Sequence, residues 1–473
     1  MKKLTVKALA LLLALTLSVG SVSAFAYYEP NITEDEIFFI EDIFDDENFT
    51  AIMEAHAISI FGHAFMENHN RSLATIATLY SFLPQNRAGK ISYPENFGGL
   101  YIDGNGNLVV LNVTRPMAFS DDASISVFVN TLGYMQDIDH GVIIRNVDFS
   151  YNELMEVIHF LGEFHELFPE IAFRNASGWH LDLPGNRVVI NLIDLSEEEI
   201  ALFRNEVIDS PALVFQQSLG RYSQWYEPYL CSEERTLFEY ESIAPLSISL
   251  NIGQQIQTLS TIAASIGYRA RSNITGMPGF VTAAHAGDPH PMPGLPLTPY
   301  HRFNVMDERG RLIGRMTHNR YFSLNVVDAM FVELAGATLS DQIPHHLRPP
   351  CSLYVSPNIV PALAGSRMGQ VVFLIGTTVG GNTELRTGRV AITNITETRW
   401  HPEHGFITLT YDGVNFNDRL WGGMSGGIVF SRFHDLTLFR FGVTGIAVLA
   451  LPGNSGGIIR AENINRRLEL SFN

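Results

Sequence analysis

The sequence predicts an α+β region followed by an all-β region of two small packed barrels. The first part combines apolar residues at helical spacing with two hairpin-like segments, and the second carries many short apolar segments bounded by Gly, Pro, Asn or Asp. With 46% hydrophobic and 17% charged residues, the chain can form packed cores, which excludes a disordered or collagen-like protein. A length of 473 residues leaves room for about two to four folded units.

The N-terminal segment has the composition of a secretory signal peptide. Lys2, Lys3 and Lys7 form a basic start, residues 9–17 are almost all apolar, and small residues suited to a signal peptidase follow. The apolar run is too short for a stable membrane span. We therefore expect cleavage of residues 1–26 and secretion of the rest to the extracellular medium, without stable membrane insertion. An uncleaved N-terminal anchor is the alternative.

Charge divides the remaining chain into two parts, here called the acidic half (27–245) and the basic half (246–473). The acidic half has 35 Asp and Glu against 10 Lys and Arg, whereas the basic half has 14 against 18, with no lysine. A net charge of −18 disfavours nucleic-acid binding. Complementary charge favours docking of one half on the other, although an acidic half that is merely well solvated explains the same counts.

The acidic half is predicted to be an α+β region that contains one unit twice. Apolar residues recur at three and four spacings over 37–65 and 154–168, which is typical of helices. Residues 98–113 and 177–192 share a pattern of strand, Asp/Gly/Asn turn and strand, which predicts two hairpins.

One group in this half has the residue types of a metal site. His159, Glu163 and His165 lie on a Leu/Phe-rich amphipathic segment, but they lack the two-His spacing of zinc-binding helices. We interpret them as ordinary helix residues and expect neither a metal nor an organic cofactor. Two cysteines, Cys231 and Cys351, are too few for a disulfide scaffold. They either pair across the two halves or stay free.

The basic half carries short strands at regular spacing, which predicts a sandwich or barrel rather than parallel βαβ units. The expected strands are residues 262–268, 279–282, 311–316, 329–334, 371–375, 388–395, 406–411, 428–430, 441–448 and 456–460, with a closing helix over 461–470.

Three segments of the basic half carry residues that are typical of nucleophilic catalysis. His285 ends an apolar strand among small residues, Asp328 begins an apolar strand, and Ser425 is surrounded by glycines that permit a tight turn. A hydroxyl is a weak nucleophile at neutral pH and needs a base such as His285. A buried Asp328 would orient that imidazole, and the backbone N–H groups of Gly423 and Ser425 would form an oxyanion hole.

These segments resemble the chymotrypsin-like (trypsin-like) serine proteases, specifically their bacterial secreted branch of streptogrisin and α-lytic protease relatives. Residues 282–285, Thr-Ala-Ala-His, match the family's histidine motif, and residues 423–427, Gly-Met-Ser-Gly-Gly, are similar to its nucleophile motif. The chain order His, Asp, Ser is the family's order. The resemblance implies a double β-barrel protease domain that acts on proteins or peptides. The hairpins of the acidic half look like the propeptide of such zymogens, which assists folding and then inhibits the enzyme in cis.

The sequence departs from this family at two positions. The family usually has Asp before the nucleophile, in an ion pair that shapes the oxyanion loop, and here that residue is Met424. The loop must therefore be held in another way. Ala286 replaces a cysteine that often follows the histidine, so that disulfide is missing.

Rival residues exist for two of the three roles. Ser455 also lies in a Gly-x-Ser-x-Gly pattern, but only 18 residues follow it, too few for the strands expected after the nucleophile. Asp307 and Asp341 are rivals of Asp328. An α/β-hydrolase is rejected because that fold places its acid and histidine after the serine, and His434 is the one histidine after Ser425.

The resemblance leaves specificity and processing open. Arg419 and Thr444 fall near the family's substrate pocket, where Arg419 either favours an acidic side chain or is an ordinary surface residue. Thr444 is expected to hydrogen-bond the buried carboxylate. Self-cleavage is expected at about residues 240–252, in an exposed linker. The alternatives are a catalytically inert binding protein of this fold and an HtrA-like quality-control protease without a PDZ domain.

Overall fold

The computed structural model describes most of the acidic and basic halves. The described residues are 47–83, 91–114, 142–168, 171, 174–218, 248–251, 254–257, 263–287, 304–307, 310–319, 327–335, 337–340, 367–378, 383–401, 405–421, 423–434, 439–450 and 454–472. The expected signal peptide, Cys231, Cys351, Asp341 and most of the expected processing segment lie outside them. No helix among these ranges is both long and apolar enough to cross a membrane.

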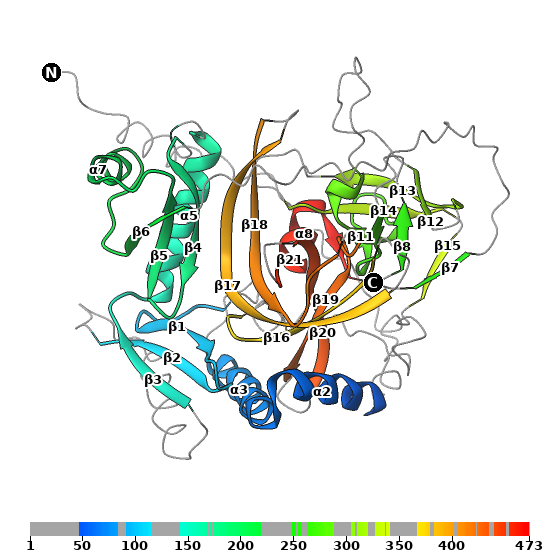
Figure 1. The fold of residues 1–473 in the computed structure, drawn as a ribbon, viewed down its shortest axis with the longest axis horizontal. Helices are drawn as coiled ribbons and strands as arrows, with labels where there is room; N and C mark the ends of the chain where they lie inside the picture. Colours follow the sequence, from blue (N-terminus) through cyan, green and yellow to red (C-terminus); the bar gives the residue numbers. More distant parts are fainter. Residues whose placement is uncertain are drawn as a thin grey trace, which may run out of the picture. The chain divides into compact units, whose positions relative to one another are not determined.

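The acidic half contains the same arrangement twice, in which an antiparallel hairpin is followed by a strand parallel to its second member (Figure 1). The first unit has α3 (His63–Phe82), β1 (Phe97–Ile102), β2 (Leu108–Val113) and β3 (Val142–Val147); the second has α5 (Tyr151–Leu167), β4 (Ala176–Asp182), β5 (Arg187–Leu192), α7 (Glu197–Glu206) and β6 (Leu213–Gln217). Both expected hairpins are therefore confirmed.

The hairpin turns of the two units use the same polar device. The Asp103 carboxylate accepts the backbone N–H groups of Asn105 and Asn107 at 2.8 and 2.9 Å, and the Asp182 carboxylate accepts that of Gly185 at 3.1 Å. An aspartate at this position satisfies turn donors that the ladder leaves unpaired. The helix expected over 37–65 differs. α2 (Glu47–Phe61) ends at Phe61, because Gly62 has a φ of 85°, which breaks the helix before α3.

The basic half is built almost entirely from antiparallel strands. One sheet has the order β22-β10-β11-β14-β13-β12-β8-β9, and a parallel pair joins β7 to β15. Their bounds are β7 (Ile248–Asn251), β8 (Gln255–Gln257), β9 (Ala263–Ser265), β10 (Arg269–Ser272), β11 (Pro278–Thr282), β12 (Asn304–Asp307), β13 (Leu312–Asn319), β14 (Met330–Leu334), β15 (Ala337–Ser340) and β22 (Leu470–Ser471).

The remaining strands form a closed ring. β16 pairs with both β19 and β17, so the order β16-β19-β20-β21-β18-β17 returns to its start. The bounds are β16 (Val371–Thr377), β17 (Thr383–His401), β18 (Gly405–Phe416), β19 (Ile428–His434), β20 (Phe439–Ala450) and β21 (Ser455–Arg460), followed by α8 (Ala461–Leu468). One of the two expected barrels is therefore closed by its own pairing. The other sheet has an open order among its described strands, so the second barrel stays a prediction.

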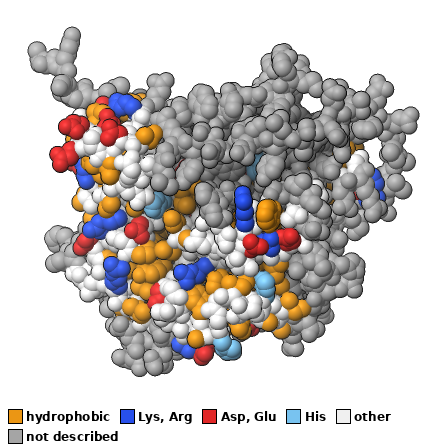
Figure 2. All heavy atoms as spheres, in the orientation of Figure 1, with side chains coloured by type: hydrophobic (Ala, Val, Ile, Leu, Met, Phe, Trp, Pro, Cys, Tyr) orange, Lys and Arg blue, Asp and Glu red, His pale blue; other side chains and the backbone are white. Residues whose placement is uncertain are grey.

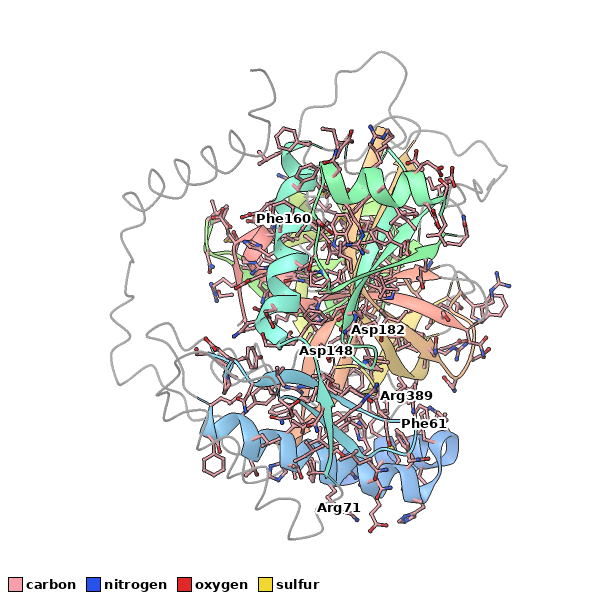
Figure 3. All side chains as sticks on the ribbon, turned by 90° about the vertical axis from the view of Figure 1, so that its left-hand side faces the viewer. Phe61, Arg71, Asp148, Phe160, Asp182 and Arg389 are labelled. Carbon is pink, nitrogen blue, oxygen red and sulfur yellow. The ribbon has the colours of Figure 1, made fainter. Side chains whose placement is uncertain are left out.

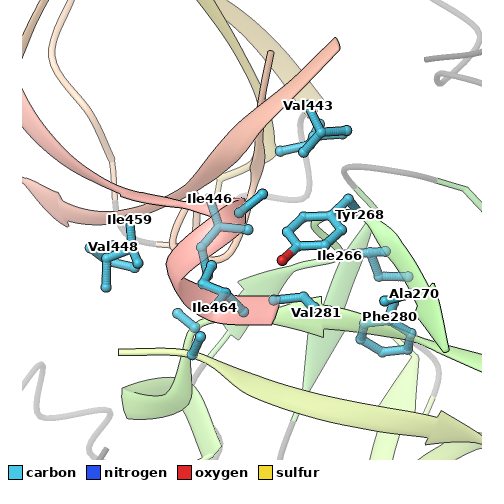
Figure 4. Packing of buried hydrophobic residues seen from close by; sticks show 14 of the residues in the cluster. Ile266, Tyr268, Ala270, Phe280, Val281, Val443, Ile446, Val448, Ile459 and Ile464 are labelled. Atoms are coloured by element: carbon cyan, nitrogen blue, oxygen red, sulfur yellow. The ribbon is translucent and has the colours of Figure 1, made fainter. Parts of the chain in front are cut away.

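A shared core joins the open sheet to the ring and to α8. Tyr268, Val281, Ile446 and Ile464 belong to one cluster of buried residues (Figure 4). The hydroxyl of Tyr268 donates to Asn465 Oδ1 at 2.8 Å, which satisfies the one polar atom of a side chain that is otherwise buried. The C-terminal helix thus fixes the two sheets against each other.

The acidic half docks on the ring by extending its sheet. β4 pairs antiparallel with β17, with Leu181 opposite Thr393 and Trp179 opposite Thr396, so β4, β5 and β6 continue the ring's sheet outward (Figure 1). Backbone pairing of this kind satisfies an exposed strand edge and gives strong positional specificity.

Docking of α2 and of the first repeated unit uses apolar, cation–π and polar contacts. The guanidinium of Arg389, on β17, lies 5.6 Å from the centre of the Phe65 ring. Figure 3 shows Arg389 near Phe61, the last residue of α2. Arg432 of β19 forms an ion pair with Glu54 at 3.2 Å. The backbone N–H of Ile102 donates to the carbonyl of Met368, just before β16, at 2.9 Å.

Charged side chains of the acidic half are found both at the interface and on the solvent-exposed surface. The ion pair between Arg432 and Glu54 links the two halves. Many acidic side chains face solvent instead, and Figure 2 shows acidic side chains gathered over α7, whose first turn holds Glu197, Glu198 and Glu199. Backbone pairing, apolar contacts and this ion pair together form the described interface.

Two histidines of the acidic half are buried against the ring. His69 Nε2 accepts the backbone N–H of Val371 at 3.1 Å, and His165 Nε2 lies 2.9 Å from Thr408 Oγ1. Burial, with a smaller effect of the Arg432 and Arg389 charges, lowers the pKa of His69 from 6.5 to about 3. Burial lowers the pKa of His165 to about 4. Both rings are therefore held neutral in the docked chain.

Acidification should weaken the folded, docked chain. Because the folded-state pKa values lie below the ordinary 6.5, the unfolded chain binds more protons, and stability falls as pH drops from about 6.5 towards 4. Each histidine costs up to about 1.4 kcal/mol per pH unit in that window. Urea unfolding at several pH values measures the loss.

Two variants identify the responsible group. His69→Gln keeps a hydrogen-bond acceptor but cannot titrate, so its stability should depend less on pH than that of the parent. His159→Gln is the control, because His159 is exposed and pairs only with Glu163 in the described contacts. Equal acid sensitivity in the parent and in His69→Gln would show that His69 is not responsible.

Candidate active site

Strand register brings His285 and Asp328 together. β11 and β14 pair antiparallel, with Thr282 at the end of one opposite Met330 at the start of the other. His285 follows Thr282 by three residues, in a short 3-10 helix (Ala284–Gly287), and Asp328 precedes Met330 by two. Both residues therefore emerge at the same end of the sheet, although 43 positions separate them in sequence.

The Asp328 carboxylate holds His285 at two points. Its Oδ1 accepts the backbone N–H of His285 at 2.9 Å, and its Oδ2 lies 2.6 Å from the ring Nδ1. Asp328 is fully buried, whereas the His285 side chain is 21% exposed. An ionised carboxylate can only accept, so Nδ1 is the donor and Nε2 keeps a lone pair for a proton. This arrangement suits a general base.

Ser425 lies on a tight turn that the neighbouring glycines make possible. Gly423 and Gly426 have φ values of 92° and 83°, which residues with a Cβ rarely adopt. The backbone N–H of Gly427 donates to the Met424 carbonyl at 2.9 Å, which closes the turn before β19 begins. Ser425 itself is half-buried at the tip of this turn.

The turn is packed against the segment that carries His285. The backbone N–H of Ser265 donates to the Ser425 carbonyl at 2.8 Å, and the Ser265 carbonyl accepts the Thr282 hydroxyl at 2.8 Å. A Cβ at Gly426 would lie 2.8 Å from the Ala283 nitrogen. Ser425 and His285 therefore stand on adjoining segments. The contacts among described residues include no direct hydrogen bond between the His285 ring and the Ser425 hydroxyl.

Two backbone N–H groups of the Ser425 turn have no acceptor among the described residues. Among the described residues, no acceptor takes up the backbone N–H of Gly423 or of Ser425, whereas Met424, Gly426 and Gly427 donate to carbonyls. Unused N–H groups beside a hydroxyl can bind the charge that develops on a carbonyl oxygen.

The two residues expected near a substrate pocket have other described partners. Thr444 is buried and donates its hydroxyl to Ser431 Oγ at 2.9 Å, so the expected bond to Asp328 is wrong. Arg419 is exposed, with its guanidinium 5.4 Å from the centre of the exposed Trp421 ring. A role of either residue in specificity stays a prediction.

The rival residues are engaged elsewhere. Ser455 begins β21 and donates to Asn415 Oδ1 at 2.9 Å, so it is part of a paired strand rather than a tight turn. Asp307 is buried and accepts the Arg311 Nε–H at 2.7 Å within the turn between β12 and β13.

The residues considered for a metal site do not converge. His159 pairs with Glu163 at 3.1 Å on the exposed face of α5, while His165 points to Thr408. Within the described ranges, no group of three His, Cys, Asp or Glu side chains is arranged to hold a metal.

Comparisons with known proteins give two results. A family model described as "Pro-like C-terminal domain" matches residues 152–218, which is the second repeated unit. No curated protein matches the chain.

The fold comparison gives matches to bacterial serine protease structures. Protease A of Thermobifida fusca is 17% identical with a TM-score of 0.34, over 47% of this chain and 97% of that one. The active form of the Rv3671c protease of M. tuberculosis is 14% identical with a TM-score of 0.29, over 50% and 93%. The serine endoprotease of Yersinia pestis is 14% identical with a TM-score of 0.26, over 46% and 60%. At these scores the likeness carries no weight for activity, which has to be judged from the site itself.

Packing around Gly426 gives a test of the turn. Gly426→Ala should destabilise the protein by the left-handed backbone strain of about 1–2 kcal/mol plus about 1–3 kcal/mol for the collision with Ser265, Thr282 and Ala283. Gly276→Ala is the matched control, since Gly276 also has a positive φ, of 69°, but open space around its Cβ. Urea midpoints measure both. Equal losses would mean that the turn is not packed against β11.

Proposed function

We propose that this chain is a secreted serine endopeptidase, made as a zymogen, that hydrolyses peptide bonds through a Ser425–His285–Asp328 triad. The observation that carries the proposal is the two-point bond between the buried Asp328 carboxylate and a partly exposed His285. A serine hydroxyl becomes a good nucleophile only when an accessible imidazole can take its proton. A buried carboxylate holds that imidazole in the required orientation. The glycine-bounded turn of Ser425 lies on the adjoining segment.

The chemistry follows from these roles. Ser425 Oγ attacks the carbonyl carbon of the substrate, and His285 Nε2 takes the hydroxyl proton. Asp328 holds the Nδ1–H and stabilises the imidazolium that forms. The backbone N–H groups of Gly423 and Ser425 donate to the oxyanion of the tetrahedral intermediate.

Collapse of that intermediate releases the amine, which receives the proton from His285. The acyl group stays on Ser425 Oγ as an ester. Water then attacks the ester with His285 again as base, and the acid product leaves with the free enzyme restored. These steps need proton transfer and charge stabilisation, which the named groups can provide.

The acidic half is proposed to serve the basic half as a propeptide in cis. Support comes from the β4–β17 pairing, from the buried histidines at the interface, and from the similarity of residues 152–218 to a Pro-like C-terminal domain. The described docking contacts fall on the ring and on the chain before β16. His285 belongs to the other sheet. These contacts therefore favour a role of the acidic half in folding the ring over a role in covering His285.

A catalytically inert binding protein of the same fold is the alternative. Its support in the sequence is Met424 in place of an acid. The turn around Met424 is nonetheless closed by hydrogen bonds, and the three reactive side chains are present, so the geometry favours catalysis.

Covalent labelling tests the proposed nucleophile. An organophosphonate should label the secreted protein on one serine, and Ser425→Ala should abolish labelling because it removes the attacking oxygen. Ser455→Ala should label like the parent, since Ser455 is a strand residue bonded to Asn415. Intact-mass spectrometry counts the adducts. A folded parent protein that takes up no label, or a label that survives in Ser425→Ala, would contradict the proposal.

The third member of the triad has its own test. Asp328→Asn should lower kcat for a peptide ester by about 10³–10⁴-fold, because an amide can present its N–H₂ to Nδ1 and stabilise the wrong tautomer. Asp307→Asn is matched in burial but pairs with Arg311. That control should lose stability while kcat changes little. Similar kcat values for the two variants would remove Asp328 from the mechanism.

A further inference from the structure

The nucleophile turn is held by one buried serine of the other sheet. Ser265, at the end of β9, is fully buried. Its backbone N–H donates to the Ser425 carbonyl at 2.8 Å, and its hydroxyl donates to the Gly423 carbonyl at 2.8 Å. These two carbonyls flank the Met424–Ser425 peptide, whose N–H is one of the two proposed oxyanion donors.

Ser265 is itself fixed from two further directions. Its hydroxyl oxygen accepts the backbone N–H of Thr377, at the end of β16, at 2.8 Å. Its carbonyl accepts the hydroxyl of Thr282, three residues before His285, at 2.8 Å. One residue thus ties the turn of Ser425 both to the ring and to the strand that leads to His285. All of these bonds are buried, where an unmade hydrogen bond is costly.

Met424 completes the anchor without charge. It is 1% exposed and belongs to an apolar cluster inside the ring with Leu374, Val429 and Leu420. A thioether forms no ion pair, so the shape of the turn does not depend on an ion pair at residue 424. The turn is also formed with the acidic half still attached.

We propose that Ser265 is a positioning residue that fixes the oxyanion turn in place of an ion pair. This inference rests on the proposed protease function. Loss of the Ser265 hydroxyl would free the Gly423 carbonyl and allow the Gly423–Met424 peptide to rotate, which moves the neighbouring oxyanion donors. With this anchor, the turn has its final shape before the chain is cleaved, and removal of the acidic half is not required to form it.

The decisive measurement compares Ser265→Ala with the parent and with a matched control. Ser272→Ala is that control, because Ser272 is also fully buried and its hydroxyl accepts two backbone N–H groups, from Ile274 and Thr275, in a hairpin of the same half. Both variants should lose similar stability in urea. Ser265→Ala alone should lower kcat for a peptide ester by about 10- to 100-fold with KM changed less than about threefold, because a small misplacement of donors acts on the transition state.

A second variant, Ser265→Cys, tests the same role if Ser265→Ala folds poorly. Ser265→Cys keeps the size of the side chain but is a weak donor, so kcat should fall between those of the parent and Ser265→Ala. Phosphonate labelling rates of Ser425 should follow the same order. A parent that labels normally, with Ser265→Ala or Ser265→Cys at the parent's kcat, would overturn the role of Ser265 alone. A folded parent that does not label would overturn the protease proposal instead.

Discussion

The pairing of β11 with β14 is the constraint on which the candidate site depends. Antiparallel register places the end of one strand opposite the start of the next, so residues just beyond Thr282 and just before Met330 have to meet. The buried carboxylate of Asp328 then finds a partner for both oxygens in the backbone and ring of His285. Without that partner, an acid with no exposed surface would be strongly unfavourable. The same contact therefore stabilises the fold and orients the imidazole.

The turn that carries Ser425 comes from the other sheet. Hydrogen bonds of Ser265 and Thr282 join it to the segment that carries His285. Glycines at 423 and 426 allow the turn to approach that strand closely. The core around Tyr268 and α8 holds the two sheets together, so packing sets the position of the Ser425 turn relative to the sheet that carries His285 and Asp328.

The acidic half binds the ring through backbone hydrogen bonds between strands, as the strands of the ring bind one another. Its second repeated unit extends the sheet from β17. The helices α2 and α3 pack against the side of the ring that holds β16 and β19. Interfaces built from backbone pairing form only when the partner strand has its final register. A half that recognises β17 in this way can stabilise the ring during folding, which fits the proposed propeptide role.

Local patterns were enough to predict much of this architecture. The short apolar segments of the basic half became strands, and Asp103 and Asp182 mark hairpin turns in both repeats. Long-range pairing was not predictable from such patterns. Nothing in the residues around Thr393 indicates that β4 will pair there, and the return of β16 to β17 depends on the curvature of the whole sheet.

Among the residues of the proposed site, His285, Asp328 and Ser425 were predicted because their chemistry is recognisable in short motifs. Ser265 was missed, since a serine among small residues of a strand has no local signature, and its role depends on atoms more than 100 positions away. Thr444 was misjudged for a related reason. Its hydroxyl meets Ser431 on the neighbouring strand, a contact set by the register of β19 and β20.

The most direct measurement is a crystal structure of the protein after reaction with an organophosphonate. Phosphorus should be bonded to Ser425 Oγ, with a phosphoryl oxygen about 2.7–3.1 Å from the backbone nitrogens of Gly423 and Ser425 and with His285 Nε2 beside the adduct. An adduct on another residue, or an imidazole that stays out of reach of Ser425 while still bonded to Asp328, would contradict the account.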